Sequence, residues 1–197
     1  MLPPFKKIKI EEGLFEKFIF PATQLINDLP EIVSGSNREI DFTFEKQLRS
    51  LIYYHLEEHD SGRHLLQDLQ ENEFAKEHVS ASGVKKSTFF EAINSRGLEQ
   101  LQILFTKLQK VARRSISEQY SALGELIAVD GSLIECCLSM IWADDRRGKH
   151  KAKIHLGFNV NRGIPAQLAI SKGNANELHY VDKLIQPGET GIFDRNY

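Results

Sequence analysis

Two aspartates that each end an apolar run are the residues in this chain best suited to chemistry. Asp130 follows the apolar residues Leu126–Val129, and Asp194 follows Gly191–Phe193 near the end of the chain. β-Branched residues pack well on a pleated surface, so both runs are predicted to be strands. If the two strands are neighbours, the two carboxylates could share one Mg²⁺ or Mn²⁺ ion, because carboxylate oxygens suit hard cations.

The same two residues also allow a purely structural explanation. Asp130 could begin an Asp-Gly turn, and Asp194 could cap the end of its strand. Phosphoryl transfer on a pair of metal ions also normally needs a third carboxylate to hold both ions. Spacing alone therefore leaves both explanations open.

A basic segment, residues 146–153, lies between the two acids. Cationic side chains on a Gly-containing loop can neutralise phosphates without reading a base sequence. We therefore predict DNA-backbone contacts from Arg146, Arg147, Lys149, Lys151 and Lys153. The alternative is a solvated hairpin. Trp142 could stack on a base or simply pack, and His155 is out of phase with the apolar face of its strand, so it would face the site or solvent.

Composition describes an ordinary soluble protein of 197 residues, with 41% apolar and 26% charged side chains. The net charge of −2 gives no overall basic field, so local patches must carry any nucleic-acid binding. No apolar run is long enough for a membrane span, and no signal peptide is evident. The adjacent Cys136 and Cys137 would point to opposite faces of a strand, which makes a disulfide between them improbable. A cytoplasmic, reducing location is expected.

The first part of the chain, residues 1–120, is predicted to be helical. Apolar spacing indicates a helix over Leu14–Ile26 with a kink or break at Pro21, and Asp41 is the expected cap of the next helix. The apolar stripe predicted on that helix consists of Phe44, Leu48, Leu51, Ile52 and Leu56. A later long helix is predicted to carry a second apolar stripe, with Leu98, Leu101, Phe105, Leu108 and Ala112.

A helix-turn-helix is a further hypothesis for Val79–Ile93. Its second helix would open with Lys85, Lys86, Ser87 and Thr88, whose side chains could reach phosphates and base edges of DNA. The alternative is a helical hairpin in which Phe89, Phe90 and Ile93 are core residues.

The second part, residues 121–197, alternates strand-like runs with turns. Its predicted order β-β-β-α-β matches an incomplete mixed sheet of the ribonuclease-H type, in which the first and fourth strands lie side by side. The expected fold is therefore α+β or α/β, with an all-helical region in front of this sheet. The division between the two parts is the predicted domain boundary.

Four blocks of the second part resemble a known family. They read D-G-S-L-I, then L-S-M-I-W-A-D-D-R-R-G-K-H-K-A-K-I-H-L-G-F-N, then G-I-P-A-Q-L-A-I-S-K-G-N-A-N-E, and finally F-D-R-N-Y. Together they are similar to DDE transposases of the insertion-sequence-four group over about residues 124–197. The resemblance implies metal-dependent strand hydrolysis and strand transfer on DNA. It assigns Asp130 and Asp194 to the first two catalytic acids, with transposon ends and target DNA as partners and a homodimer as a possible assembly.

The departure from the family concerns its third acid, a Glu downstream of the second Asp. The chain ends at Tyr197, and Glu177 resembles a different block. We therefore expect the front part of a transposase, inactive alone, whose sheet lacks its last strand and leaves apolar surface exposed. A non-catalytic DNA-binding protein or inhibitor of transposon ends is the alternative. A complete metal-dependent nuclease is a third possibility, for which Glu135 and Asp182 are the nearby candidate acids.

Overall fold

The protein has an α+β fold that divides into two compact units, Met1–Leu108 and Gln109–Tyr197. The computed structural model describes residues 12–32, 39–80, 84–115, 121–135, 144–146 and 149–194. The predictions made for Cys136 and Cys137, for Trp142 and for Arg147 lie outside these ranges. Within the described ranges, no helix has the length and apolar character needed to cross a membrane.

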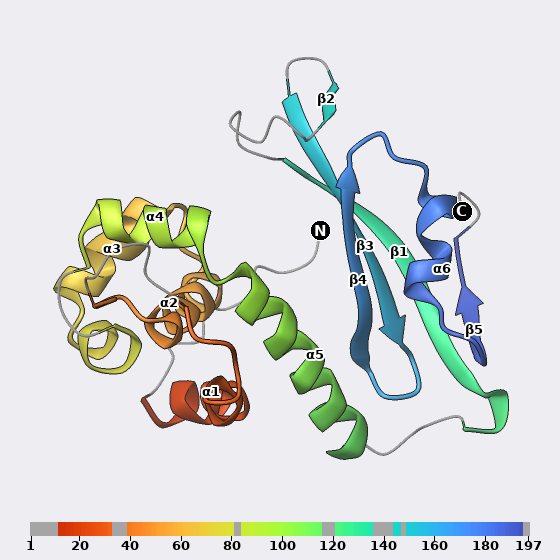
Figure 1. The fold of residues 1–197 in the computed structure, drawn as a ribbon, viewed down its shortest axis with the longest axis horizontal. Coiled ribbons are helices and arrows are strands. Elements are labelled where there is room, and N and C mark those ends of the chain that lie inside the picture. The colour runs from red at the N-terminus through yellow and green to blue at the C-terminus, as the bar shows by residue number, and fades with distance from the viewer. Residues whose placement is uncertain are drawn as a thin grey trace, which may run out of the picture. The chain divides into compact units, whose positions relative to one another are not determined.

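The first unit is helical, as its periodicity predicts (Figure 1). Its described elements are α1 (Glu12–Ile26), α2 (Phe44–Leu56), α3 (Gly62–Glu71), the π-helical turn η1 (Ala75–Val79), α4 (Lys86–Ser95) and most of α5 (Leu98–Ser115). Its main core packs Phe15 of α1, Tyr53 of α2, Leu65 of α3 and Phe89 of α4 together, each no more than 2% exposed. Burial of these large side chains is the main force that holds the short helices in place.

Three details of the predicted helices differ from the structure. Helix α1 continues through Pro21 without a break. The N-cap of α2 is Thr43, whose hydroxyl accepts from the Lys46 amide, whereas Asp41 offers only its backbone carbonyl, to the Lys46 ammonium. Leu98, predicted on the apolar stripe of α5, is 68% exposed, and the buried hydrophobic residue among those described on α5 is Leu104.

The second unit is a mixed sheet covered by a short helical segment. Its elements are η2 (Ser121–Leu123), β1 (Glu125–Glu135), β2 (Asp144–Arg146), β3 (Lys149–Asn159), β4 (Ile164–Lys172), η3 (Glu177–Tyr180), α6 (Val181–Leu184) and β5 (Glu189–Ile192). Strand β3 pairs antiparallel with β1, β2 and β4, and β1 pairs in parallel with β5. Since β1 occupies one edge of β3, the strands β2 and β4 follow one another along the other edge.

The predicted first and fourth strands are β1 and β5, and they lie side by side as expected. Their register joins Glu125 with Glu189 and Ala128 with Ile192. Counting only the four predicted strands, the sheet runs third, second, first, fourth. The short strand β2 pairs with the start of β3, which agrees with the hairpin that the sequence left open as the alternative for this segment.

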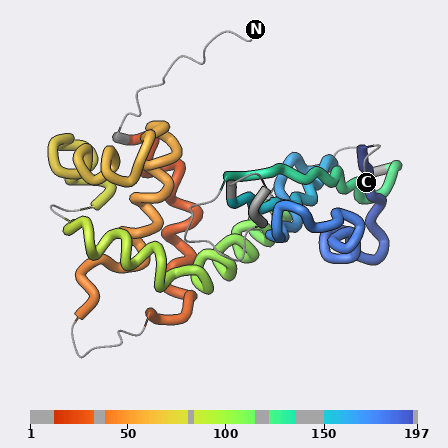
Figure 2. Tube along the Cα trace, turned by 90° about the horizontal axis from the view of Figure 1, so that it is seen from above, coloured from red at the N-terminus to blue at the C-terminus, as the bar shows by residue number. Residues whose placement is uncertain are grey.

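The segment η3–α6 covers one face of this sheet (Figure 2). Leu184 of α6 packs with Ile127 and Val129 of β1, which alternate onto that face. Gly157 of β3 permits the approach, because a Cβ there would lie 3.0 Å from the backbone carbonyl oxygen of Leu184. The close contact fixes α6 against the middle of the sheet.

The opposite face of the sheet carries exposed apolar side chains. Phe158, Leu168, Ile170 and Ile192 are between 36% and 55% exposed. By the pairing register they share a face with Asp130, whose partner on β3 is Leu156. The exposed apolar surface that the sequence predicted is thus found on the face that bears the candidate acid.

Candidate functional site

The two candidate acids lie two residues beyond the last recorded pair of β1 and β5. The parallel pairing of β1 with β5 holds one offset from Glu125 and Glu189 to Ala128 and Ile192. Continued by two residues, the same offset would set Asp130 opposite Asp194, which lies beyond the end of β5 and outside the recorded pairing. Neighbouring strands are about 4.8 Å apart, and partners in register project to the same face.

Both carboxyl groups belong to exposed residues. If the register continues to Asp194, the two carboxylates would form a donor set that Mg²⁺ accepts, since this ion is usually held by one or two carboxylates together with waters and substrate phosphates. Among the described residues, no group of three or more His, Cys, Asp and Glu side chains is gathered closely enough to hold a metal ion. The pair therefore fits a single, substrate-assisted cation better than a closed metal centre.

The two additional acids considered from the sequence lie on the wrong face of the sheet. Strand β1 pairs with β3 without a bulge from Ile127 to Glu135, so Glu135 points away from the face of Asp130. Asp182 belongs to α6, which covers that same opposite face. Neither acid can join Asp130 in this arrangement.

The basic segment forms a short hairpin between β2 and β3. Arg146 pairs with Lys149 and Asp144 with Lys151 along the backbone. Further along β3, the ammonium of Lys153 lies 2.6 Å from the carboxylate of Glu177 on η3, and its side chain is 14% exposed. Lys153 would have to leave this ion pair to contact a phosphate.

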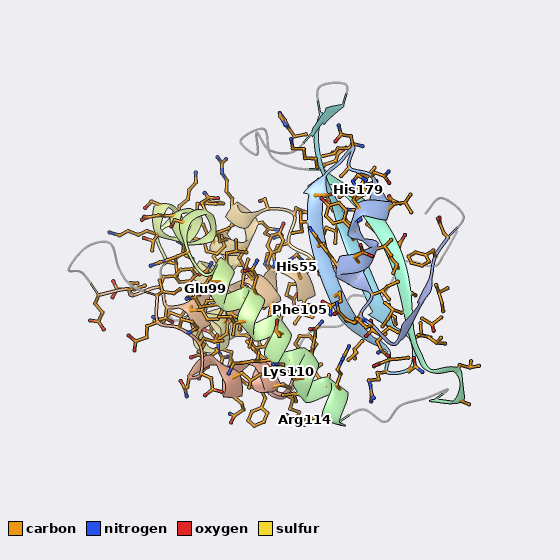
Figure 3. All side chains as sticks on the ribbon, turned by 45° about the vertical axis from the view of Figure 1, so that its right-hand side comes forward. His55, Glu99, Phe105, Lys110, Arg114 and His179 are labelled. Carbon is orange, nitrogen blue, oxygen red and sulfur yellow. The ribbon has the colours of Figure 1, made fainter. Side chains whose placement is uncertain are left out.

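His155 lies neither beside the candidate acids nor in solvent, contrary to both sequence-based alternatives. Its ring is fully buried and stacks on Tyr180, with ring centroids 4.2 Å apart. Figure 3 shows the covering segment η3, which also carries the labelled His179. Burial, and secondarily the charge of Lys153, lower the pKa of His155 below its ordinary value.

The neutral form of His155 explains its hydrogen bonds. Its Nε2 lies 2.8 Å from Ser171 Oγ, and that hydroxyl donates to the Lys172 carbonyl. The hydroxyl proton is thereby committed, so Nε2–H donates to Ser171 and Nδ1 carries the lone pair. Nδ1 is buried and has no hydrogen-bond partner among the described residues. His155 is thus a structural residue beneath η3.

The residues predicted to contact DNA in the helical unit lie at the start of α4. Lys85, Lys86 and Ser87 are exposed and Thr88 is half-buried, and the N-cap residue Lys85 makes no side-chain capping bond. Phe89 is buried, whereas Ile93 is 38% exposed. The buried Phe89 therefore fixes the first turn of α4 to the core, while the polar side chains of this turn remain accessible to solvent.

Some interactions around the sheet carry no sequence signal. The contacts of Lys153 with Glu177 and of His155 with Tyr180 join residues about 25 positions apart, which no local periodicity encodes. Comparison of the chain with protein-family models, with curated proteins and with solved structures finds no significant match. Function must therefore be argued from the site itself.

Proposed function

We propose that the second unit is a metal-dependent domain of the DDE transposase type, acting on the phosphodiester backbone of DNA. The observation that carries the proposal is the parallel register of β1 and β5, which would set Asp130 opposite Asp194 if it continued two residues beyond its last pair. Carboxylates at corresponding ends of adjacent strands are a recurrent way to hold Mg²⁺ against a phosphate.

Two further features support this proposal. The order of the four predicted strands, with the first and fourth parallel, is the one expected of a ribonuclease-H-like sheet. The described residues of the four sequence blocks that resemble the insertion-sequence-four transposases lie mainly on β1, β2, β3 and β4, at Glu177 where η3 begins, and directly after β5.

In this proposal, Asp130 and Asp194 hold Mg²⁺ or Mn²⁺, which would polarise a phosphate and activate a water. Lys151 and Lys153 pair with Glu135 and Leu133 and therefore lie on the face opposite Asp130. In this proposal, the cations of residues 146–153 would contact DNA phosphates away from the metal ion. Two carboxylates are too few to fix a pair of ions, so we expect residues 1–197 to bind metal without cleaving DNA efficiently.

The test is a titration of the full chain with Mn²⁺, followed by calorimetry and by electron paramagnetic resonance. We expect Asp130→Asn and Asp194→Asn each to weaken Mn²⁺ binding at least tenfold, because each removes one of two charged ligands. Asp182→Asn is the matched control, since Asp182 is also exposed but lies on the segment that covers the other face. Equal affinity in all three variants would refute the metal site. Efficient cleavage of transposon-end DNA in Mg²⁺, abolished by Asp130→Ala, would refute the expected lack of catalysis.

A second candidate function is non-catalytic DNA binding by the helical unit. It is favoured by the accessible Lys85, Lys86 and Ser87 above the buried Phe89. In this case, Asp130→Asn would leave DNA affinity unchanged in a gel shift with terminal-repeat DNA.

A further inference from the structure

A small groove separates the exposed side of α3 from the start of α4. Its described lining consists of Arg63, Leu66, Gln67 and Gln70 from α3, and Val84 and Lys86 around the start of α4. Its volume of about 190 Å³ is below the range of pockets that enclose small molecules, which is about 300–1,000 Å³. The groove therefore suits contact with part of a macromolecule better than enclosure of a small molecule.

The polar lining follows from the periodicity of α3. Arg63, Gln67 and Gln70 are spaced i, i+4 and i+7, so they share one exposed stripe of the helix. The opposite stripe, with Leu65 and Leu69, is buried in the core of the helical unit. The groove residues are thus displayed by a helix whose other side is fixed.

Close packing also fixes the distance between the two helices. A Cβ on Gly62, at the start of α3, would lie only 3.0 Å from the ring of Phe90 on α4. The glycine therefore lets the two helices approach more closely than any larger residue would allow. Arg63 directly follows Gly62 in α3, and Lys86 lies one turn before Phe90 in α4. Both cations are therefore close in sequence to the contact between Gly62 and Phe90.

The charge of the groove indicates an anionic partner. No acidic side chain belongs to its described lining, although the helical unit as a whole has more acidic than basic residues. Glu71, one turn beyond Gln67, accepts a hydrogen bond from the Gln67 amide. Cations beside neutral amides suit a sugar–phosphate backbone, because Arg and Lys bind phosphates while Gln can bond to sugars, phosphates or base edges.

We propose that this groove docks duplex DNA, with Arg63 and Lys86 on backbone phosphates and Gln67 and Gln70 between them. The proposal rests on the proposed function, which supplies DNA as the partner. It adds a contact surface on α3 to the contacts expected from the start of α4.

The experiment measures the fluorescence anisotropy of labelled duplex DNA with the full chain at several salt concentrations. We expect the double variant Arg63→Ala/Lys86→Ala to weaken binding at least tenfold and to reduce the slope of log affinity against log salt by about two. Lys17→Ala/Lys110→Ala is the matched control. It removes the same charge from exposed lysines outside the described groove lining, and we expect less than a twofold loss. The conservative variant Arg63→Lys/Lys86→Arg should retain the salt slope.

Three results would overturn the proposal. These are equal losses in the groove and control variants, competition by polyglutamate as effective as that by unlabelled DNA, and a wild-type chain that binds no duplex at all. The Mn²⁺ titration of Asp130 and Asp194 does not involve the groove. Failure of the docking surface is therefore distinguishable from failure of the proposed metal site.

Discussion

At the scale of single residues, the tertiary structure determines the burial and the pKa of His155. His155 lies on a strand whose sequence pattern offers only solvent or a site as its surroundings. In the fold it is enclosed by Ser171 of β4, Tyr180 and Glu177 of η3, and Lys153 of its own strand. Burial disfavours the charged imidazolium, which lowers the pKa of His155.

The lowered pKa predicts a pH dependence of stability. The unfolded chain binds a proton at His155 near pH 6.5, whereas the folded chain binds it only at lower pH. The contribution of neutral His155 is therefore complete above about pH 6.5, and it is lost as the pH falls towards the lowered folded pKa. Urea denaturation between pH 8 and pH 5 should show a decline in the free energy of unfolding of at most about 1.4 kcal/mol per pH unit from this group.

His155→Gln should flatten that part of the pH dependence, because the variant has no proton to bind at this position. His179→Gln is the control, since His179 is an exposed histidine on the same helical segment. The explanation fails if the two variants have the same pH dependence as the wild type.

At the scale of secondary structure, helix ends depend on which of several candidate caps has the right backbone geometry. Asp41 and Thr43 both precede α2, and both residue types are good caps. Thr43 has the extended backbone conformation of an N-cap, and its hydroxyl lies 3.4 Å from the Lys46 amide nitrogen. Thr43 is therefore the N-cap because of its position directly before the first helical turn, and not because threonine is a better cap than aspartate.

This difference gives a paired test. Thr43→Ala should lower the free energy of unfolding of the helical unit by about 0.5–1 kcal/mol, because it leaves a helix N–H without its side-chain acceptor. Asp41→Ala should change it by less than about 0.5 kcal/mol, since Asp41 contributes its backbone carbonyl, which alanine retains. Thermal denaturation of both variants measures the two effects. A larger loss from Asp41→Ala would restore the original prediction.

At the scale of the whole molecule, each unit has its own hydrophobic core. Leu65 belongs to the core of the helical unit, and Leu184 belongs to the core beneath the sheet. Both residues are fully buried. Separate cores allow the units to unfold in separate cooperative steps.

Differential scanning calorimetry of the full chain should resolve two transitions. Leu65→Ala should lower the midpoint of one transition and Leu184→Ala that of the other, because each creates a cavity worth about 2–5 kcal/mol in a single core. A single transition lowered equally by both substitutions would show that the units unfold as one.

Periodicity alone determined much of this fold. The helices of the first unit and, apart from β2, the β-β-β-α-β order of the second unit follow local patterns of apolar and turn residues. The neighbouring positions of β1 and β5 were expected from the match of that order to a ribonuclease-H type of sheet, and the parallel pairing confirms them. The pairing of Asp130 with Asp194 is still a sequence-based prediction, because the recorded register of β1 and β5 ends at Ala128 and Ile192.

The tertiary structure decided which face of each element is buried. On β3, the apolar residues Ile154, Leu156 and Phe158 form the more regular stripe, yet the fully buried side chains are His155 and Asn159. The reason is that η3 and α6 pack on the other face, where Tyr180 stacks on His155 and Gly157 admits the backbone of Leu184. A strand pattern specifies two faces, but only contacts between distant segments determine which face is covered.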